Sequence, residues 1–311
     1  RGADFVFTSI RVGGIEQRAH DEAVALRHGV LGQETIGPAG FAMTVRTIPP
    51  LLGSGHEVED LPPHAWVINF TNPVGPVPQA LLTQTGARVI GICDTPTELF
   101  EEVAHALDVP SAECHFDYFG LNHLGWLREV YYRGRPQLPR LWGHPELLRK
   151  VYRAPLFDPE YLSELKLLPT EYVYYYVRTR HAAENIRQAG QTRGQVIAQL
   201  NDDLFRDLAP PGADVVSVYE RYLAARNAGY MQIESGGAPG GVPHGTALQA
   251  LTGYDKIALS VVRAIHFNTG AVIPLNVRNN GNLPLAADDC VEVPCVVNAT
   301  GAWPTHVPPV P

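Results

Sequence analysis

The sequence predicts an α/β fold with a mostly parallel, doubly wound sheet. Segments rich in β-branched and aromatic residues, which favour strands, cover residues 5–10, 66–70 and 88–93. Segments with helical spacing of apolar residues cover 15–26, 42–52, 77–85 and 97–107, with two prolines near the end of the second. Strands that alternate with helices along a chain are typical of a parallel sheet covered on both faces.

The rest of the chain follows a different pattern, and we expect a domain boundary between residues 113 and 119. Alternating side chains predict an antiparallel strand over 126–132. The later patterns indicate helices within 144–208, an aromatic cluster at 172–176, a mobile Gly/Pro-rich loop over 235–247, an amphipathic helix over 254–266, strands over 272–277 and 290–297, and an irregular tail over 302–311. A chain of 311 residues is long enough for two domains, which we place at 1–115 and 116–311.

Composition and charge argue against several classes of protein. Apolar residues make up 45% of the chain, which is typical of a globular protein with a core. The net charge is −8 and no basic stripe occurs, so we expect no nucleic-acid partner. Apolar runs fall far short of the ~20 residues of a membrane span, so we expect no membrane partner. The four cysteines form no CxxC motif, which favours free thiols in a reducing compartment and predicts a cytoplasmic protein.

A Cys-Asp pair, Cys93 and Asp94, stands at the turn between the predicted strand 88–93 and the next helix. Ligands of such sheets bind at the carboxyl ends of the strands. His123 lies in another loop, and a thiolate and an imidazole together suit a first-row transition metal. Two simpler interpretations stay open. Cys93 could be a buried apolar side chain, and Asp94 could cap the following helix rather than act as an acid.

Other polar residues stand where they can reach a ligand. Asn72 follows the strand 66–70 and offers both a donor and an acceptor, or else serves as a turn residue. Arg11 and Arg18 flank a Gly-Gly turn, where an arginine can grip a phosphate or simply lie in solvent. Tyr254 opens a helix and competes with Tyr230 as a base. A tyrosine base needs a cation nearby to lower its pKa from about 10, and most tyrosines at such positions only pack.

Taken in order, these motifs resemble those of glycoside hydrolase family 4, the NAD-dependent glycosidases, and are closest to its 6-phospho-β-glucosidase branch. The matching segments cover residues 10–14 with Arg18, 32–35, 72–75, 93–96, 120–123, 276–281 and 291–295. An ordered series across nearly the whole chain is far more specific than any one motif. The resemblance implies a Rossmann-like doubly wound sheet, truncated at its amino terminus, and an α+β carboxyl-terminal domain similar to that of lactate and malate dehydrogenases.

The resemblance also implies an activity, the hydrolysis of 6-phospho-β-glucosides such as cellobiose 6-phosphate. In this family NAD takes a hydride from C3 of the sugar, a tyrosine removes the proton at C2, the C1–oxygen bond breaks and water adds before the hydride returns. A divalent metal, usually Mn2+, stabilises the charge that develops at C3. We therefore expect a phosphorylated sugar as substrate, NAD and Mn2+ as cofactors, and a homodimer or homotetramer.

By motif, the resemblance assigns roles to single residues. Cys93 and His123 match the metal ligands, Asp94 takes the acid position, and Glu34 matches the residue that raises the basicity of the tyrosine. The substrate-binding positions correspond to Arg11, Arg18, Asn72, Asn122 and Arg278, of which Asn72 is also a cofactor-binding position.

Three features depart from the family pattern. The Gly-rich turn that holds the NAD pyrophosphate would precede residue 1, so we expect that an amino-terminal piece is missing. Asp94 stands where β-type members often carry Asn and α-type members carry Asp. The family's Arg-Gly-Gly-Ala-Tyr-Tyr stretch is split by an insertion, with 226–230 matching its front and 254–258 its back. We assign the base to Tyr254 and keep Tyr230 as the alternative.

Other functions stay open at this point. They are a 6-phospho-α-glucosidase or α-glycosidase of the same family, an NAD-dependent dehydrogenase of the malate or lactate type, and a non-catalytic sensor of sugar phosphates. A dehydrogenase of that type would use a His–Asp pair and would not need a metal at Cys93 and His123.

Overall fold

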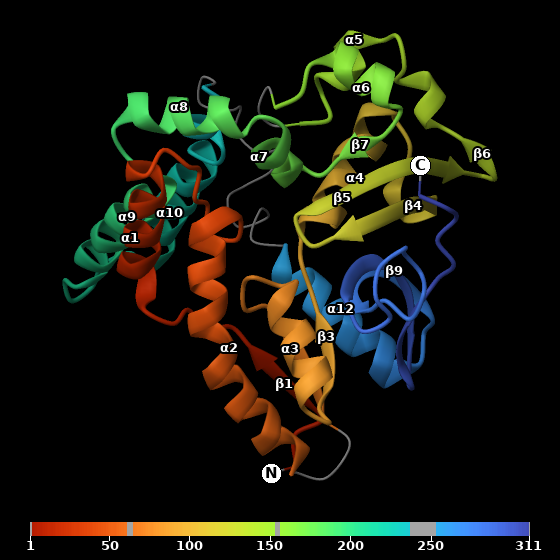
Figure 1. Cartoon of the computed structure of the whole chain (residues 1–311), viewed down its shortest axis with the longest axis horizontal. Helices are drawn as coiled ribbons and strands as arrows, with labels where there is room; N and C mark the ends of the chain where they lie inside the picture. Colours follow the sequence, from red (N-terminus) through yellow and green to blue (C-terminus); the bar gives the residue numbers. More distant parts are fainter. Residues whose placement is uncertain (1, 61–64, 153–155, 237–252, 311) are drawn as a thin grey trace.

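The computed structural model describes residues 2–60, 65–152, 156–236 and 253–310 (Figure 1). Within them, a six-stranded sheet runs in the order β1-β2-β3-β8-β9-β10. Its first three strands, β1 (Phe5–Thr8), β2 (Trp66–Asn69) and β3 (Arg88–Gly91), are parallel. The strands and the helices between them, apart from α2 (Gly37–Glu59), lie close to the expected positions, and the predicted Rossmann-like α/β fold is confirmed.

The strands β2 and β3 are buried on both faces, and successive side chains point to opposite sides of the sheet. Val67 and Val89 pack with Leu51 of α2 (Gly37–Glu59) and with α3 (Pro76–Gln84). Ile68 and Ile90 pack on the other face, against α12 (Tyr254–Phe267). Because helices cover both faces, the sequences of β2 and β3 are nearly continuous apolar runs.

The second half of the sheet comes from the far end of the chain. The strands β8 (Ala271–Arg278), β9 (Cys290–Asn298) and β10 (Gly301–Pro304) are antiparallel. β8 joins β3 in antiparallel register, where Gly91 faces Asn276. The sheet is therefore parallel only in its first half. Our expectation of an irregular tail from residue 302 was wrong for its first residues, which form β10 as an edge strand on β9. The division at residue 115 stays a prediction.

A smaller antiparallel sheet carries part of the site. It consists of β4 (Cys114–Leu121), β5 (Leu124–Tyr132), β6 (Arg135–Pro136) and β7 (Leu168–Pro169). The antiparallel strand predicted over 126–132 is thus confirmed. The tight turn between β4 and β5 contains Asn122 and His123.

The helices α1 (Gly14–Arg27) and α4 (Thr95–Ala106) follow β1 and β3. Figure 1 shows α1 beside α9 (Arg193–Leu208) and α10 (Val215–Ala228) at one side of the molecule, with β4, β5, α5 (Pro145–Leu148) and α6 (Pro159–Leu165) at the other. The remaining helices are α7 (Tyr174–Val177), α8 (Thr179–Ala189) and α11 (Gln232–Ser235), with 3-10 turns at Ser111–Glu113, Leu138–Arg140 and Glu171–Val173.

None of the helices in the described part of the chain has an apolar stretch long enough to cross a membrane. Most of the Gly/Pro-rich loop predicted over 235–247 lies outside the described residues.

The helix α2 is longer than we expected. We predicted a helix over 42–52 that stops near its two prolines, but α2 runs from Gly37 to Glu59 and continues through Pro49 and Pro50. Both prolines are exposed, while the buried stripe of α2 includes Met43 and Leu51. The carbonyl groups that lose a donor at the prolines can therefore be hydrated, and packing of the buried stripe keeps the helix in one piece.

Candidate active site

The candidate site lies at the carboxyl ends of β1, β2 and β3. Cys93 stands two residues after the end of β3, and His123 reaches it from the turn between β4 and β5. Both side chains are buried, and the Cys93 Sγ atom lies 3.5 Å from His123 Nε2. Residues thirty positions apart in the sequence are thus brought together as the metal hypothesis requires.

The imidazole of His123 is held on two sides. Its ring stacks on Tyr172, with the ring centroids 3.7 Å apart and the planes within 13°. Its Nδ1 atom lies 2.7 Å from the hydroxyl oxygen of Thr35. Burial lowers the pKa of His123 to about 4, so the ring is neutral at neutral pH. Thr35 and Tyr172 stood inside segments that we singled out from the sequence, but we gave neither of them a role.

Asp94 occupies the N-cap position of α4 without making a side-chain capping hydrogen bond. Instead, its Oδ1 atom lies 3.9 Å from Cys93 Sγ, and the Tyr254 side chain is its neighbour on α12. It also packs so closely on Gly253 that a Cβ atom there would lie 2.2 Å from Asp94 Oδ2. Burial raises the pKa of Asp94. The carboxyl group therefore lies next to Cys93 and Tyr254 at the start of α4.

The two candidate tyrosines have different neighbours. Tyr254 stacks on Phe70, with the ring centroids 5.9 Å apart. Burial, and then the neighbouring Cys93 and Asp94, raise the pKa of Tyr254 well above its ordinary value. Tyr230 instead donates its hydroxyl to the carboxylate of Glu171. Tyr254 is thus the tyrosine that is linked directly to the Cys-Asp pair.

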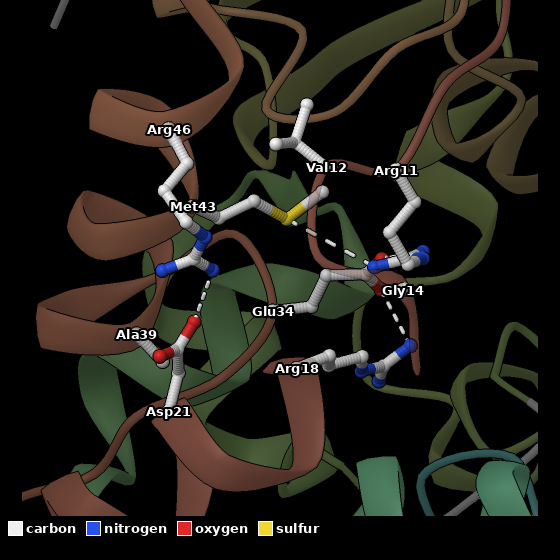
Figure 2. A pocket seen from close by; sticks show the side chains of 9 residues that line it. All are labelled: Arg11, Val12, Gly14, Arg18, Asp21, Glu34, Ala39, Met43 and Arg46. Atoms are coloured by element: carbon white, nitrogen blue, oxygen red, sulfur yellow. Dashed lines mark hydrogen bonds and ion pairs between the residues drawn. The ribbon is translucent and has the colours of Figure 1, made fainter. Parts of the chain in front are cut away.

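Glu34 lies between two arginines in the pocket of Figure 2. Arg18 Nη1 lies 2.8 Å from Glu34 Oε2, and Arg11 donates to the other carboxylate oxygen. Burial alone would raise the pKa of Glu34, but the charges of Arg18 and Arg11 outweigh it and hold the pKa below its ordinary value. The pocket is lined by Arg11, Val12, Gly14, Arg18, Asp21, Glu34, Ala39, Met43 and Arg46.

Arg18 has a second acidic partner that we did not identify from the sequence. Its Nε atom donates to Glu22 Oε1 at 2.9 Å, one helical turn further along α1. The other oxygen of Glu22 accepts from the backbone N–H of Gly194, 2.7 Å away in the first turn of α9. The spacing of four residues between Arg18 and Glu22 was a sequence signal for this ion pair. The ion pair helps to hold the Arg18 guanidinium in place.

The three remaining candidates have different surroundings. The side-chain oxygen of Asn72 is buried and has no hydrogen-bond partner among the described residues. Asn122 donates to Glu292 at 3.1 Å, and this buried carboxylate, which we had not assigned a role, also accepts from Tyr118 at 2.7 Å. Arg278 lies apart from the others, because its guanidinium donates to the Leu82 carbonyl on α3. Its expected role toward phosphate stays a prediction.

Two observations indicate that the residues present fit the cofactors that the family uses. A thiol and a neutral imidazole in contact are a suitable donor pair for a divalent transition metal. Among the described residues, no cluster of three or more His, Cys, Asp or Glu side chains is placed to hold a metal, so Cys93 and His123 are a donor pair and not a complete set of protein ligands. The unpaired oxygen of Asn72, after β2, needs a donor such as a carboxamide or sugar hydroxyl.

Two family models match the chain. The model described as family 4 glycosyl hydrolase matches residues 1–109, and the one described as the family 4 glycosyl hydrolase C-terminal domain matches residues 118–311. Among curated relatives, a probable 6-phospho-β-glucosidase of Bacillus subtilis is 32% identical over all of this chain and 67% of its own length. The 6-phospho-β-glucosidase of Escherichia coli is 31% identical over 98% of this chain and 64% of its own.

Solved structures agree on the fold. The 6-phospho-β-glucosidase of Thermotoga maritima with manganese, NAD+ and glucose-6-phosphate has a TM-score of 0.76 at 23% identity, over 99% of this chain and 67% of its own. A 6-phospho-α-glucosidase from gut microorganisms with NAD and glucose-6-phosphate has a TM-score of 0.72 at 26% identity, over 99% and 67%. The chain thus spans about two thirds of the length of the relatives that it matches.

Proposed function

The chain belongs to family 4 of the glycosyl hydrolases, and from this premise we propose that it hydrolyses 6-phospho-β-glucosides with NAD and a divalent metal, Mn2+ by preference. The observation that carries the proposal is the contact of Cys93 with His123, with Asp94 and Tyr254 directly beside it. The two curated relatives at 31–32% identity carry the β-glucosidase name, which favours this branch.

Each side chain of the site has a task that follows from its chemistry. Cys93 and His123 hold the metal, and Asn72 orients a ligand through its unpaired oxygen. When bound, NAD would supply the hydride acceptor for C3 of the sugar, and the metal would supply a Lewis acid. Tyr254 removes the proton at C2, and Asp94 donates a proton to the leaving oxygen at C1. Tyr230 is the alternative base.

The pocket of Figure 2 supports a task for the arginines. Arg11 and Arg18 bracket Glu34, so a phosphorylated sugar would meet guanidinium groups already fixed by carboxylates. Glu34 in turn raises the basicity of Tyr254 through its negative charge, which contributes to the raised pKa of that tyrosine. We also propose that the protein acts in the cytoplasm as a homodimer or homotetramer.

A single experiment tests the reaction. The protein is incubated in D2O with NAD, Mn2+ and an aryl 6-phospho-β-glucoside, and the sugar product is analysed by NMR. We expect deuterium at C2, since the C2 proton is lost to solvent before water adds. Cys93→Ser should abolish metal-dependent hydrolysis with the fold retained. Hydrolysis that leaves hydrogen at C2 would rule out elimination, and net accumulation of NADH with a hydroxy acid would favour a dehydrogenase.

A 6-phospho-α-glucosidase is the second candidate, and one residue favours it. Asp94 is the residue type that α-type members carry at this position. The matched α-linked aryl 6-phosphoglucoside serves as the comparison in the same assay. Faster turnover of the α anomer would replace the β assignment and leave the elimination chemistry in place.

A further inference from the structure

We infer that Gln33 and Thr35 are positioning residues that fix the tautomer of His123, with the ring proton on Nδ1 and the lone pair on Nε2. The inference deepens the proposed function, because it rests on His123 as a metal ligand. It names the residues that set the tautomer of His123 in the metal-free protein.

The first step concerns the amide of Gln33. The backbone N–H of Thr35 lies 2.8 Å from Gln33 Oε1. A backbone N–H can only donate, so the atom facing it must be the amide oxygen and not the amide nitrogen. The short loop that carries these residues is itself fixed, because the backbone groups of Gln33 and Ile36 bond to each other in both directions at 3.1 Å. Gln33 is buried in this position.

The second step concerns the hydroxyl of Thr35. Its Oγ1 atom lies 3.0 Å from the same Gln33 oxygen. An amide oxygen only accepts, so the hydroxyl must donate its one hydrogen there. Oγ1 then presents only lone pairs to His123 Nδ1, which lies 2.7 Å away. The imidazole must donate in this contact, and its proton therefore sits on Nδ1.

The third step concerns the opposite side of the ring. A neutral imidazole with its proton on Nδ1 carries a lone pair on Nε2. Nε2 faces Cys93 Sγ at 3.5 Å, so the lone pair points to the place where the two side chains share a ligand. Stacking on Tyr172 keeps the ring from turning away. Hydrogen bonds to the non-ligating nitrogen of a metal-bound histidine typically set its tautomer and affinity in this way.

The first test measures binding of Mn2+ alone by electron paramagnetic resonance of the free ion. Thr35→Val removes the acceptor, and we expect it to weaken Mn2+ binding by about 10-fold or more. Thr35→Ser keeps the hydroxyl and should bind within about 3-fold of the wild type. Thr83→Val, at an exposed position of α3, is the matched control and should leave binding unchanged. Equal affinity of Thr35→Val and the wild type would overturn the inference.

Gln33→Met gives a sharper variant, because it keeps the Thr35 hydroxyl but frees its hydrogen. That hydrogen can then turn toward Nδ1 and favour the other tautomer. We expect weaker Mn2+ binding here as well, although no atom that touches His123 has changed. Binding as tight as in the wild type would remove Gln33 from the set of positioning residues.

A second measurement does not depend on metal binding or on any substitution at Thr35. Long-range 1H–15N NMR of the metal-free wild type, with His123→Asn to assign the signal, reports which ring nitrogen of His123 carries the proton. We expect Nδ1–H, and a predominant Nε2–H form would overturn the inference. If the wild type bound no Mn2+, the proposed function would fail, while this spectrum would still decide the tautomer.

Discussion

The two tyrosines differ in which acidic group their hydroxyl contacts, and this leads to opposite expectations for their removal. Tyr254 lies next to Asp94, beside Cys93, whereas Tyr230 donates a hydrogen bond to Glu171. We expect Tyr254→Phe to lower kcat about 100-fold or more, the usual loss on removing a general base. Tyr230→Phe should mainly reduce the free energy of unfolding, by about 1 kcal/mol, through the lost hydrogen bond.

Both variants are compared by steady-state hydrolysis and by urea unfolding. The reverse order of activity loss would transfer the base to Tyr230. Unchanged turnover in Tyr254→Phe with normal folding would remove it from the chemistry.

The ion pairs of Glu34 with Arg18 and Arg11 should also contribute to the free energy of unfolding. Because Arg18 and Arg11 hold the pKa of Glu34 below its ordinary value of 4.5, the folded state keeps this carboxylate ionised when the unfolded chain takes up a proton. The stability that it contributes is therefore full above the unfolded pKa and is lost as the pH falls below it. We expect Glu34→Gln to cost about 3 kcal/mol near neutral pH and clearly less near pH ~4.

Urea unfolding of Glu34→Gln and of the wild type at the two pH values measures this difference. Glu57→Gln, at an exposed position of α2, is the control and should change little at either pH. A cost that does not depend on pH would mean that Glu34 is not held ionised by the arginines.

At the scale of single elements, α2 offers a matched pair of glycines two residues apart. Gly53 is exposed, and a Cβ atom there would meet nothing within 4 Å. At Gly55 the same atom would lie 2.8 Å from Leu81 Cδ2, on α3. We expect Gly53→Ala to raise the free energy of unfolding by about 0.5–1 kcal/mol through helix propensity, and Gly55→Ala to lower it by about 1–3 kcal/mol through the clash. Thermal unfolding distinguishes the two, and equal effects would contradict this packing of α2 on α3.

Elements with strong local patterns could be predicted from the sequence, and elements decided by distant contacts could not. The strand β3 and the helix α12 came out close to their predicted bounds, because burial on one or both faces leaves a clear apolar pattern. The helix α2 did not, since two prolines are a local stop signal that the buried stripe overrides. The strand β10 was missed because pairing with β9 creates it.

The same distinction applies to the site. Cys93 and His123 were recognisable because each stands in a motif after a strand or in a tight turn. The distant contacts around this pair were not recognisable, since the contact of His123 with Thr35 spans 88 residues and that of the neighbouring Asn122 with Glu292 spans 170. No local pattern encodes such a pairing. These contacts follow only from how the two sheets come together.

At the scale of the whole molecule, one sheet is built from both ends of the chain. Trp66 and Ile68 of β2 and Ile90 of β3 lie in one apolar cluster with Val261 of α12 and Leu275 of β8. Near the carboxyl terminus, Gly301 lies so close to Trp66 that a Cβ atom there would be 2.4 Å from the indole ring. The predicted domains 1–115 and 116–311 therefore share a core, and neither has the sheet complete by itself.

This arrangement predicts how the two halves behave when they are separated. A fragment of residues 1–115 exposes the face of β2 and β3 that α12 covers and the edge of β3 that β8 pairs with, so we expect it to show no cooperative thermal unfolding. Mixed with a fragment of residues 116–311, it should associate and regain a cooperative transition, since β3 and β8 can pair again. Circular dichroism and analytical ultracentrifugation follow both events. Cooperative unfolding of the isolated fragment would show that its three strands and their helices form a self-sufficient domain, and the shared cluster would then be only an interface between two independent units.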